Sequence, residues 1–109
     1  MNNKKYSNKQ EKTIAKKLGG RVQPNSGATL FAKGDVKTKK FLIECKTATT
    51  KRKSMSIKEE WIDKQRSEAF AMGKPYWSVA FNFGGLNNNE NFYIIDEQLF
   101  KHILEMIEE

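Results

Sequence analysis

The chain has 109 residues, of which 30% are charged and 38% hydrophobic, and its formal net charge is +7. This length predicts a single domain over residues 1–109, and the seven Phe, three Tyr and two Trp argue against a disordered chain. No apolar run approaches the roughly 20 residues of a membrane span, and the N-terminus lacks the apolar stretch of a signal peptide. The single Cys45 and single His102 exclude an intramolecular disulfide and a Cys/His zinc set. We therefore expect a cytoplasmic protein without membrane association.

The charge is divided unequally along the chain. Residues 1–58 hold sixteen Lys and Arg against three acids, a net charge of +13, whereas residues 59–109 hold four bases against ten acids, a net charge of −6. A strongly positive segment favours a polyanionic partner, and nucleic acid is the common one. The alternative is a Lys-rich surface that serves solubility alone.

End signals predict a first helix at residues 8–18. Ser7-Asn8-Lys9-Gln10 has the form of a capping box, and Gly19-Gly20 supplies the left-handed residue that ends a helix. Residues 1–6 are expected to form a flexible basic arm. Extended segments are predicted at 21–23, 34–36 and 41–47, with loop residues at 25–28.

The second half of the chain predicts two more helices and two strands. Ser56-Ile57-Lys58-Glu59 is a second capping box, and Gly73 ends the helix that it opens. Two aromatic-rich strands follow at 76–83 and 92–95, joined by a polar hairpin loop. Asp96 caps a closing amphipathic helix. The predicted element order is αβββαββα, an α/β fold with a mixed five-stranded sheet flanked by helices.

The best strand in the sequence is Phe41–Lys46, and it carries two candidate functional side chains. Alternation places Phe41, Ile43 and Cys45 on one face, which we expect to be core, and Leu42, Glu44 and Lys46 on the other. Asp35 precedes Glu44 by nine residues across a tight turn, so its carboxylate is expected beside that of Glu44 on a neighbouring strand. Two converging carboxylates repel unless a cation lies between them, and oxygen ligands of this kind suit Mg²⁺.

The set Gly34-Asp35 followed by Ile43-Glu44-Cys45-Lys46 resembles the signature of the PD-(D/E)XK nuclease superfamily, with Gly34 in place of the nominal Pro. The resemblance is closest to the archaeal-type Holliday junction resolvases and their phage relatives. In that branch an early helix carries a Glu, here Glu11, and a Ser-Gly loop follows, here Asn25-Ser26-Gly27-Ala28. The matches cover roughly residues 8–83 and imply a restriction-endonuclease-like fold.

The resemblance implies Mg²⁺-dependent hydrolysis of DNA phosphodiesters, with Mn²⁺ expected to substitute. Asp35, Glu44 and the main-chain carbonyl of Cys45 would hold the metal, and Glu11 would contribute to the metal site or its water shell. Lys46 would orient the attacking water or neutralise charge on the phosphate; because an ordinary Lys has a pKa of about 10.4, the electrostatic role is favoured. Ser26 would contact the scissile phosphate. The alternatives are an exposed helix carboxylate for Glu11 and simple turn formation for Ser26.

The sequence also suggests roles for residues outside the acidic pair. Some relatives in the superfamily carry an active-site Gln at the position of Gln65, although a solvated helix position is the more ordinary expectation. The run Lys51-Arg52-Lys53 directly follows the Glu-x-Lys strand, so it is expected to contact DNA phosphates together with Lys33 and Lys37. Trp61 and Trp77 are expected in the core or an interface, and His102 near the surface.

The most concrete hypothesis is a structure-specific DNA endonuclease of the Holliday junction resolvase type. A four-way junction has two-fold symmetry and needs two matched cuts, so a protomer with one site is expected to act as a homodimer. If the protein is phage-encoded, its place of action would be the cytoplasm of a bacterial host. The alternatives are another PD-(D/E)XK nuclease, such as a nickase or a DNA-degrading enzyme, and a basic DNA-binding module without catalysis.

Overall fold

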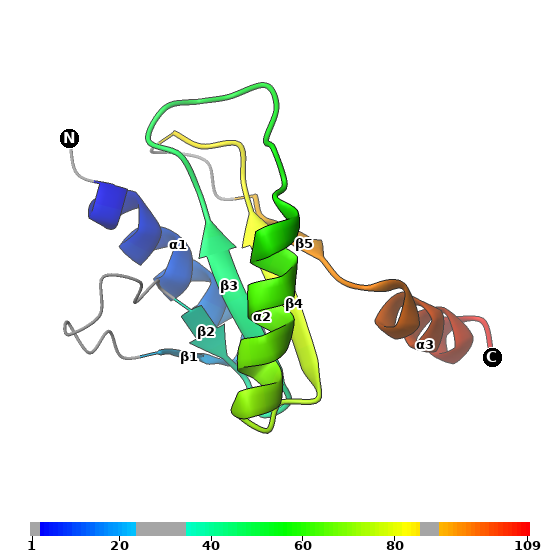
Figure 1. The fold of residues 1–109 in the computed structure, drawn as a ribbon. Coiled ribbons are helices and arrows are strands. Elements are labelled where there is room, and N and C mark those ends of the chain that lie inside the picture. Colours follow the sequence, from blue (N-terminus) through cyan, green and yellow to red (C-terminus); the bar gives the residue numbers. More distant parts are fainter. Residues whose placement is uncertain (1–2, 24–34, 86–89) are drawn as a thin grey trace.

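The computed structural model describes residues 3–23, 35–85 and 90–109, with side chains from residue 9 onward. It is an α/β fold with three helices and a mixed five-stranded sheet, in the predicted order αβββαββα (Figure 1). The helices are α1 (Asn3–Leu18), α2 (Glu59–Ala71) and α3 (Glu97–Ile107). The strands are β1 (Arg21–Val22), β2 (Asp35–Lys37), β3 (Phe41–Lys46), β4 (Tyr76–Phe81) and β5 (Phe92–Ile94). Of the predicted site residues, Ser26 and Lys33 lie outside the described part of the chain.

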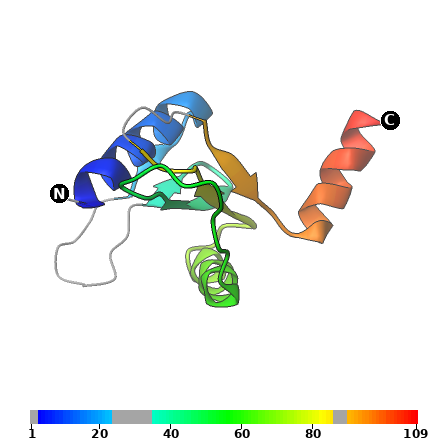
Figure 2. The same cartoon turned by 90° about the horizontal axis from the view of Figure 1, so that it is seen from above.

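The five strands lie in sequence order across the sheet. The pairs β1–β2, β2–β3 and β4–β5 are antiparallel, and β3–β4 is parallel. The parallel pair requires a crossover connection, and α2 provides it. The central strands β3 and β4 are consequently covered on both faces, by α1 on one side and α2 on the other (Figure 2).

Two apolar clusters fill the two faces of the sheet. Ile14 of α1 packs with Val36, Ile43, Cys45 and Ala80 on one face. On the other face α2 packs on the second cluster, which consists of Leu42, Ala69, Trp77 and Val79. The alternation predicted along β3 is confirmed, and the placement of Trp77 in the core is correct. The face that carries Leu42, Glu44 and Lys46, for which no core was predicted, is also largely buried.

The first helix begins earlier than the sequence pattern predicts. It starts at Asn3, so Ser7 lies inside the helix and the predicted capping box is wrong. Residues 3–6, expected to form a basic arm, belong to the same helix. The segment before Gln10 contains neither Pro nor Gly, and Lys is a good helix former, so nothing in this segment stops the helix at Ser7. The predicted end is confirmed, because Gly19 adopts a φ of 71° directly after Leu18.

The start of α2 also departs from the prediction. The N-cap is Lys58, whose side chain makes no capping hydrogen bond, and Ser56 precedes the helix. A capping box contributes only about 1 kcal/mol, whereas Trp61 and Ile62 pack against the second core cluster from the first turn. Side-chain burial therefore determines where this helix begins.

The third helix lies apart from the body formed by the sheet, α1 and α2, beyond the edge strand β5 (Figures 1 and 2). Asp96 is its N-cap, as predicted, and its carboxylate accepts a hydrogen bond from the Leu99 amide at 2.9 Å. Leu99 is the one buried side chain of α3. Within the described residues, no helix is both long and apolar enough to traverse a bilayer.

Candidate active site

The register of β2 and β3 brings two predicted site residues together. Asp35 lies directly opposite Glu44, so both carboxylates project from the same face of the sheet. This is the face covered by α2, since Leu42, two residues from Glu44, packs with Ala69 of that helix. Glu44 is only 2% exposed. The convergence of these two carboxylates, inferred from a nine-residue spacing, is confirmed.

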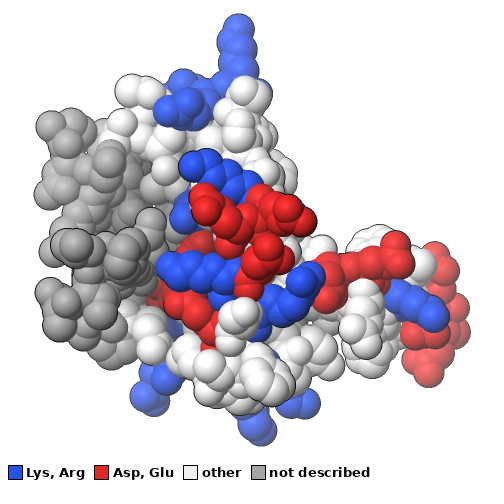
Figure 3. All heavy atoms as spheres, in the orientation of Figure 1, with Lys and Arg blue, Asp and Glu red and all other residues white. Residues whose placement is uncertain are grey.

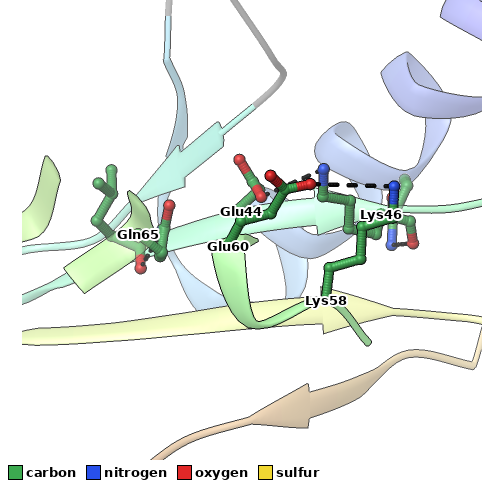
Figure 4. Close-up of polar contacts among 7 residues, drawn as sticks. Glu44, Lys46, Lys58, Glu60 and Gln65 are labelled. Carbon is green, nitrogen blue, oxygen red and sulfur yellow. Dashed lines mark hydrogen bonds and ion pairs between the residues drawn. The ribbon is translucent and has the colours of Figure 1, made fainter. Parts of the chain in front are cut away.

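Lys46 lies on the same face of β3 and forms an ion pair with Glu44. Its Nζ is 3.4 Å from the Glu44 Oε2, and Figure 4 shows the two side chains pointing toward each other. The ammonium also lies 4.4 Å from the ring centroid of Trp61, on the first turn of α2. It is therefore held between a carboxylate and the face of an indole ring. The contact with Trp61 could not be inferred from the sequence, which separates the two residues by a long loop.

Asp35 occupies an environment that disfavours its ionised form. Burial raises the pKa of this carboxyl to about 7, and the nearby carboxylates of Glu44 and Glu68 act in the same direction, while Lys64 opposes them. The buried Oδ1 of Asp35 makes no hydrogen bond within the described part of the chain. A buried oxygen without a donor is costly, and a bound cation would remove both that cost and the carboxylate repulsion.

Glu11 is buried, so the interpretation of it as an exposed surface carboxylate is wrong. It projects from α1, the helix on the opposite face of the sheet from α2, and burial raises its pKa. Burial and the neighbouring Glu11 raise the pKa of the Cys45 thiol as well, which keeps the thiol protonated on the α1 face. The charge of Glu11 also raises the pKa of Asp35, but its effect is the smallest among the charged neighbours.

Gln65 is completely buried, which overturns the expectation of a solvated helix position. Its Nε2 donates to the main-chain carbonyl of Leu42 at 3.0 Å and fixes α2 over β3 two residues from Glu44. Within the described residues its Oε1 is left without a donor. The helical spacing from Trp61 to Gln65 to Ala69 places all three on one face of α2, and this spacing is the sequence signal for burial.

Three side-chain amides near the end of β3 form a network that the sequence did not reveal; those of Gln10 and Asn82 are buried and that of Asn91 is half-buried. Gln10 Nε2 donates to the main-chain carbonyl of Lys46 at 2.9 Å and to Asn91 Oδ1 at 3.0 Å. Asn82 donates to the same Asn91 oxygen and accepts from the Thr47 hydroxyl at 2.6 Å. The network joins α1 to the ends of β3 and β4, and it fixes the backbone that carries Lys46.

The basic run Lys51-Arg52-Lys53 lies in an irregular segment, residues 47–58, which follows β3. This segment is attached to the part of the chain that follows β4. The Arg52 amide donates to the Phe83 carbonyl at 2.7 Å, and Lys51 Nζ lies 5.7 Å from the Phe83 ring centroid. Lys51, Arg52 and Lys53 are exposed. Lys37 pairs with Leu42 near the other end of β3, so the structure separates it from this run.

The charges visible on the α2 side of the molecule are mixed. Figure 3 shows Lys and Arg at the end of the molecule where residues 47–58 lie, whereas acidic side chains gather over α2 and α3. The acids of α2 are Glu59, Glu60, Asp63 and Glu68. A phosphate backbone is therefore attracted to residues 47–58 and repelled by the outer surface of α2.

The donor set at Asp35 and Glu44 fits a hard divalent cation. It offers two carboxylates from adjacent strands, one with an unpartnered buried oxygen, in a region of low dielectric constant. Over the described residues, no three His, Cys, Asp or Glu side chains are grouped closely enough to hold a metal. A cation here would complete its shell with main-chain oxygens and water, as Mg²⁺ commonly does. Comparisons with protein families, curated proteins and solved structures found no match to this chain.

Proposed function

We propose that this protein is a Mg²⁺-dependent DNA endonuclease of the PD-(D/E)XK type, with a restriction-endonuclease-like fold, acting on branched DNA as a Holliday junction resolvase. The single observation that carries the proposal is the cross-strand pair of Asp35 and Glu44, with Lys46 on the same face. The acidic pair, the adjacent ammonium and the exposed basic segment beyond the same strand are the groups that phosphodiester hydrolysis requires.

Each of these residues has a distinct role in the proposed reaction. Asp35 and Glu44, with the main-chain carbonyl of Cys45, would hold Mg²⁺ or Mn²⁺, which when bound polarises the phosphate and acidifies a water. Lys46 neutralises the negative charge that develops on the phosphate, and Glu44 and Trp61 hold its ammonium in place. Glu11 belongs to the surrounding polar shell, and Ser26 is assigned to the scissile phosphate by the resemblance alone.

The basic segment would supply affinity for DNA without reading sequence. Lys51, Arg52 and Lys53 are exposed beyond the end of β3, and they would contact phosphates together with Lys33 and Lys37. The proposed protein acts as a homodimer in the cytoplasm, that of a bacterial host if it is phage-encoded. The lone buried Cys45 fits a reducing compartment.

The test is cleavage of a synthetic four-way junction compared with a linear duplex of the same arms, each with Mg²⁺ and with EDTA. We expect paired symmetric nicks in the junction with Mg²⁺ and none with EDTA. Asp35→Asn and Glu44→Gln should abolish cutting but keep or increase junction affinity, because each removes negative charge near the phosphate. Asp63→Asn, at an exposed site on α2, is the matched control and should cut normally.

The other outcomes separate the remaining functions. Equal cutting of both substrates would indicate that the protein is another nuclease of the same superfamily. Binding without cutting would indicate a basic DNA-binding module. The deep burial of Glu44 is the observation that favours this alternative. Retained cleavage by either acidic variant would contradict the site.

A further inference from the structure

The third helix presents its polar side to its own body and its apolar side to solvent. A cavity of about 390 Å³ separates α3 from the start of β4, where Tyr76 and Trp77 line it. The α3 side chains that line this cavity are mainly polar: Gln98, Lys101, His102 and Glu105. The opposite side carries Phe100 and Ile107, which are 55% and 74% exposed. An amphipathic helix ordinarily buries its apolar side, so this side requires another partner.

The helix is too short for its backbone hydrogen bonds alone to keep it folded. It has eleven residues, and isolated helices below about 12–15 residues are marginal in water. The N-cap at Asp96 and the buried Leu99 are its main attachments to the body. Additional apolar burial is therefore needed to keep α3 folded.

Exposed apolar residues also occur on β5, the strand that leads into α3. This strand is an edge of the sheet, and one of its sides pairs with β4. An exposed apolar edge strand is a ready site for association with another chain. We define the β5–α3 surface as the exposed large apolar residues of these two elements: Phe92, Tyr93, Phe100, Leu104, Met106 and Ile107.

We propose that the β5–α3 surface is a self-association surface, on which two copies of this chain pack with their α3 helices antiparallel about a two-fold axis. Nucleic acid is disfavoured as the occupant, because Glu97, Glu105 and Glu108 surround a single base, Lys101, on this helix. The same acids repel an anionic lipid surface. Antiparallel pairing is self-complementary, since each copy offers the same apolar side to the other and the helix dipoles align favourably.

The area of the surface is that of a weak, reversible dimer. Large apolar side chains bury about 150–250 Å² each when fully covered. Phe92 and Tyr93 point to opposite faces of β5, so a partner covers only one of them. At their exposed fractions, the remaining five residues offer roughly 500 Å² per copy, or roughly 1,000 Å² for two copies, which is near the lower limit for a specific interface. We therefore expect a reversible dimer with a Kd on the order of micromolar. The proposal needs no catalytic activity and stands apart from the nuclease assignment.

Sedimentation velocity of the full chain over a concentration series, without DNA, tests the proposal. The wild type should pass from monomer to dimer near a micromolar concentration, and the double variant Phe100→Ser/Ile107→Ser should weaken the dimer at least about 10-fold, the equivalent of 1.4 kcal/mol. Phe70→Ser is the matched control: Phe70 is 87% exposed on α2, outside this surface, and its loss should leave the Kd unchanged.

A second measurement tests the orientation. Ile103 lies at the centre of the apolar side of α3, so Ile103→Cys should form a disulfide with its own copy when a mild oxidant is added, and Phe70→Cys should not. Cys45 is buried and does not compete. A wild type that stays monomeric to about 100 µM, or a dimer unaffected by the double variant, would overturn the proposal. Binding of the monomer to phosphatidylcholine vesicles through Phe100 and Ile107 would overturn it in favour of a lipid occupant.

Discussion

Asp35 illustrates how burial changes the behaviour of one side chain. Its neighbours include Glu44 across the strand pair and Glu68 on α2. Desolvation and the charges of these two acids all raise the pKa of a carboxyl whose Oδ1 has no donor among the described residues. The folded protein therefore holds a proton on Asp35 at pH values where an unfolded chain has released it. This difference makes stability depend on pH in a definite direction.

Without divalent metal, the free energy of unfolding should fall as the pH rises from about 4 to about 7. In that range the folded state binds more protons than the unfolded state, because the pKa of Asp35 is raised from 3.8 to about 7. The loss should be on the order of 3 kcal/mol. Asp35→Asn should remove most of this slope in urea unfolding curves measured at several pH values. Asp63→Asn, exposed on α2, should keep it, and identical slopes in all three proteins would refute the expectation.

Trp61 is the second residue with a testable effect, because its ring contacts the Lys46 ammonium. Trp61→Leu should lower kcat roughly 2- to 30-fold with little change in KM, the range expected for loss of a cation–π contact worth about 0.5–2 kcal/mol. Trp61→Phe should recover part of the loss. In NMR spectra, the ε-methylene resonances of Lys46 should lose their ring-current shift in Trp61→Leu.

The control for the Trp61 variant is a second cation–aromatic pair, whose cation lies on the same helix, α2. Arg66 lies 5.6 Å from the ring centroid of Trp77, and Arg66→Ala should leave turnover and the Lys46 resonances unchanged. Wild-type turnover in Trp61→Leu would show that the ring serves only to pack α2.

At the scale of elements, the connection between β3 and α2 combines two functions. Residues 47–58 begin the crossover that the parallel strands require, and they present the basic run beyond the end of β3. Hydrogen bonds from Arg52 to Phe83 and from Gly85 to Ala48 attach this segment to the chain after β4. The basic side chains are thus presented on a backbone that is anchored next to the candidate site.

Replacing Lys51, Arg52 and Lys53 together by Ala should weaken DNA binding without regard to sequence. Each lost phosphate contact reduces the slope of log K against log salt by about 0.9, so the slope should flatten by about 2–3 units if all three make contact. The measurement is fluorescence anisotropy over a salt series. The comparison variant replaces Lys39 and Lys40, which are exposed in the turn between β2 and β3. A greater effect of that variant would place the DNA at the other end of the sheet.

At the scale of the whole molecule, the two proposals predict a coupling between assembly and cleavage. One protomer carries one acidic pair, so two matched incisions in a junction require two protomers. If the β5–α3 surface joins them, both cuts occur within one encounter. The acidic charge of α3 keeps DNA away from this surface and leaves it available for the second copy.

The coupling can be measured on a supercoiled plasmid that extrudes a cruciform. The wild type should convert it directly to linear product, whereas Phe100→Ser/Ile107→Ser should accumulate the nicked circle at protein concentrations below its weakened Kd. Phe70→Ser should behave as the wild type. Direct linearisation by the double variant would show that paired cleavage does not depend on the β5–α3 surface, whatever the oligomeric state of the protein in solution.

The sequence by itself determined the elements and the acidic pair, because these depend on local signals. Period-two alternation in Phe41–Lys46 and the nine-residue spacing from Asp35 were sufficient to place the two carboxylates on one face. Glycine at 19 and 73 and the Asp96 cap correctly marked helix ends, since these are backbone preferences of single residues. The two capping boxes failed because a contribution of about 1 kcal/mol does not outweigh continued helix formation or core packing.

Only the tertiary structure decided which polar residues are buried and what they contact. The packing of α2 over β3 buries Gln65 and brings Trp61 to Lys46, and the position of α1 buries Gln10 against the end of β3. These contacts join residues up to 36 positions apart, and no local pattern specifies such pairs. The raised pKa of Asp35 and the outward apolar side of α3 have the same origin. Both depend on which surfaces are removed from water, and that is a property of the assembled fold rather than of any segment.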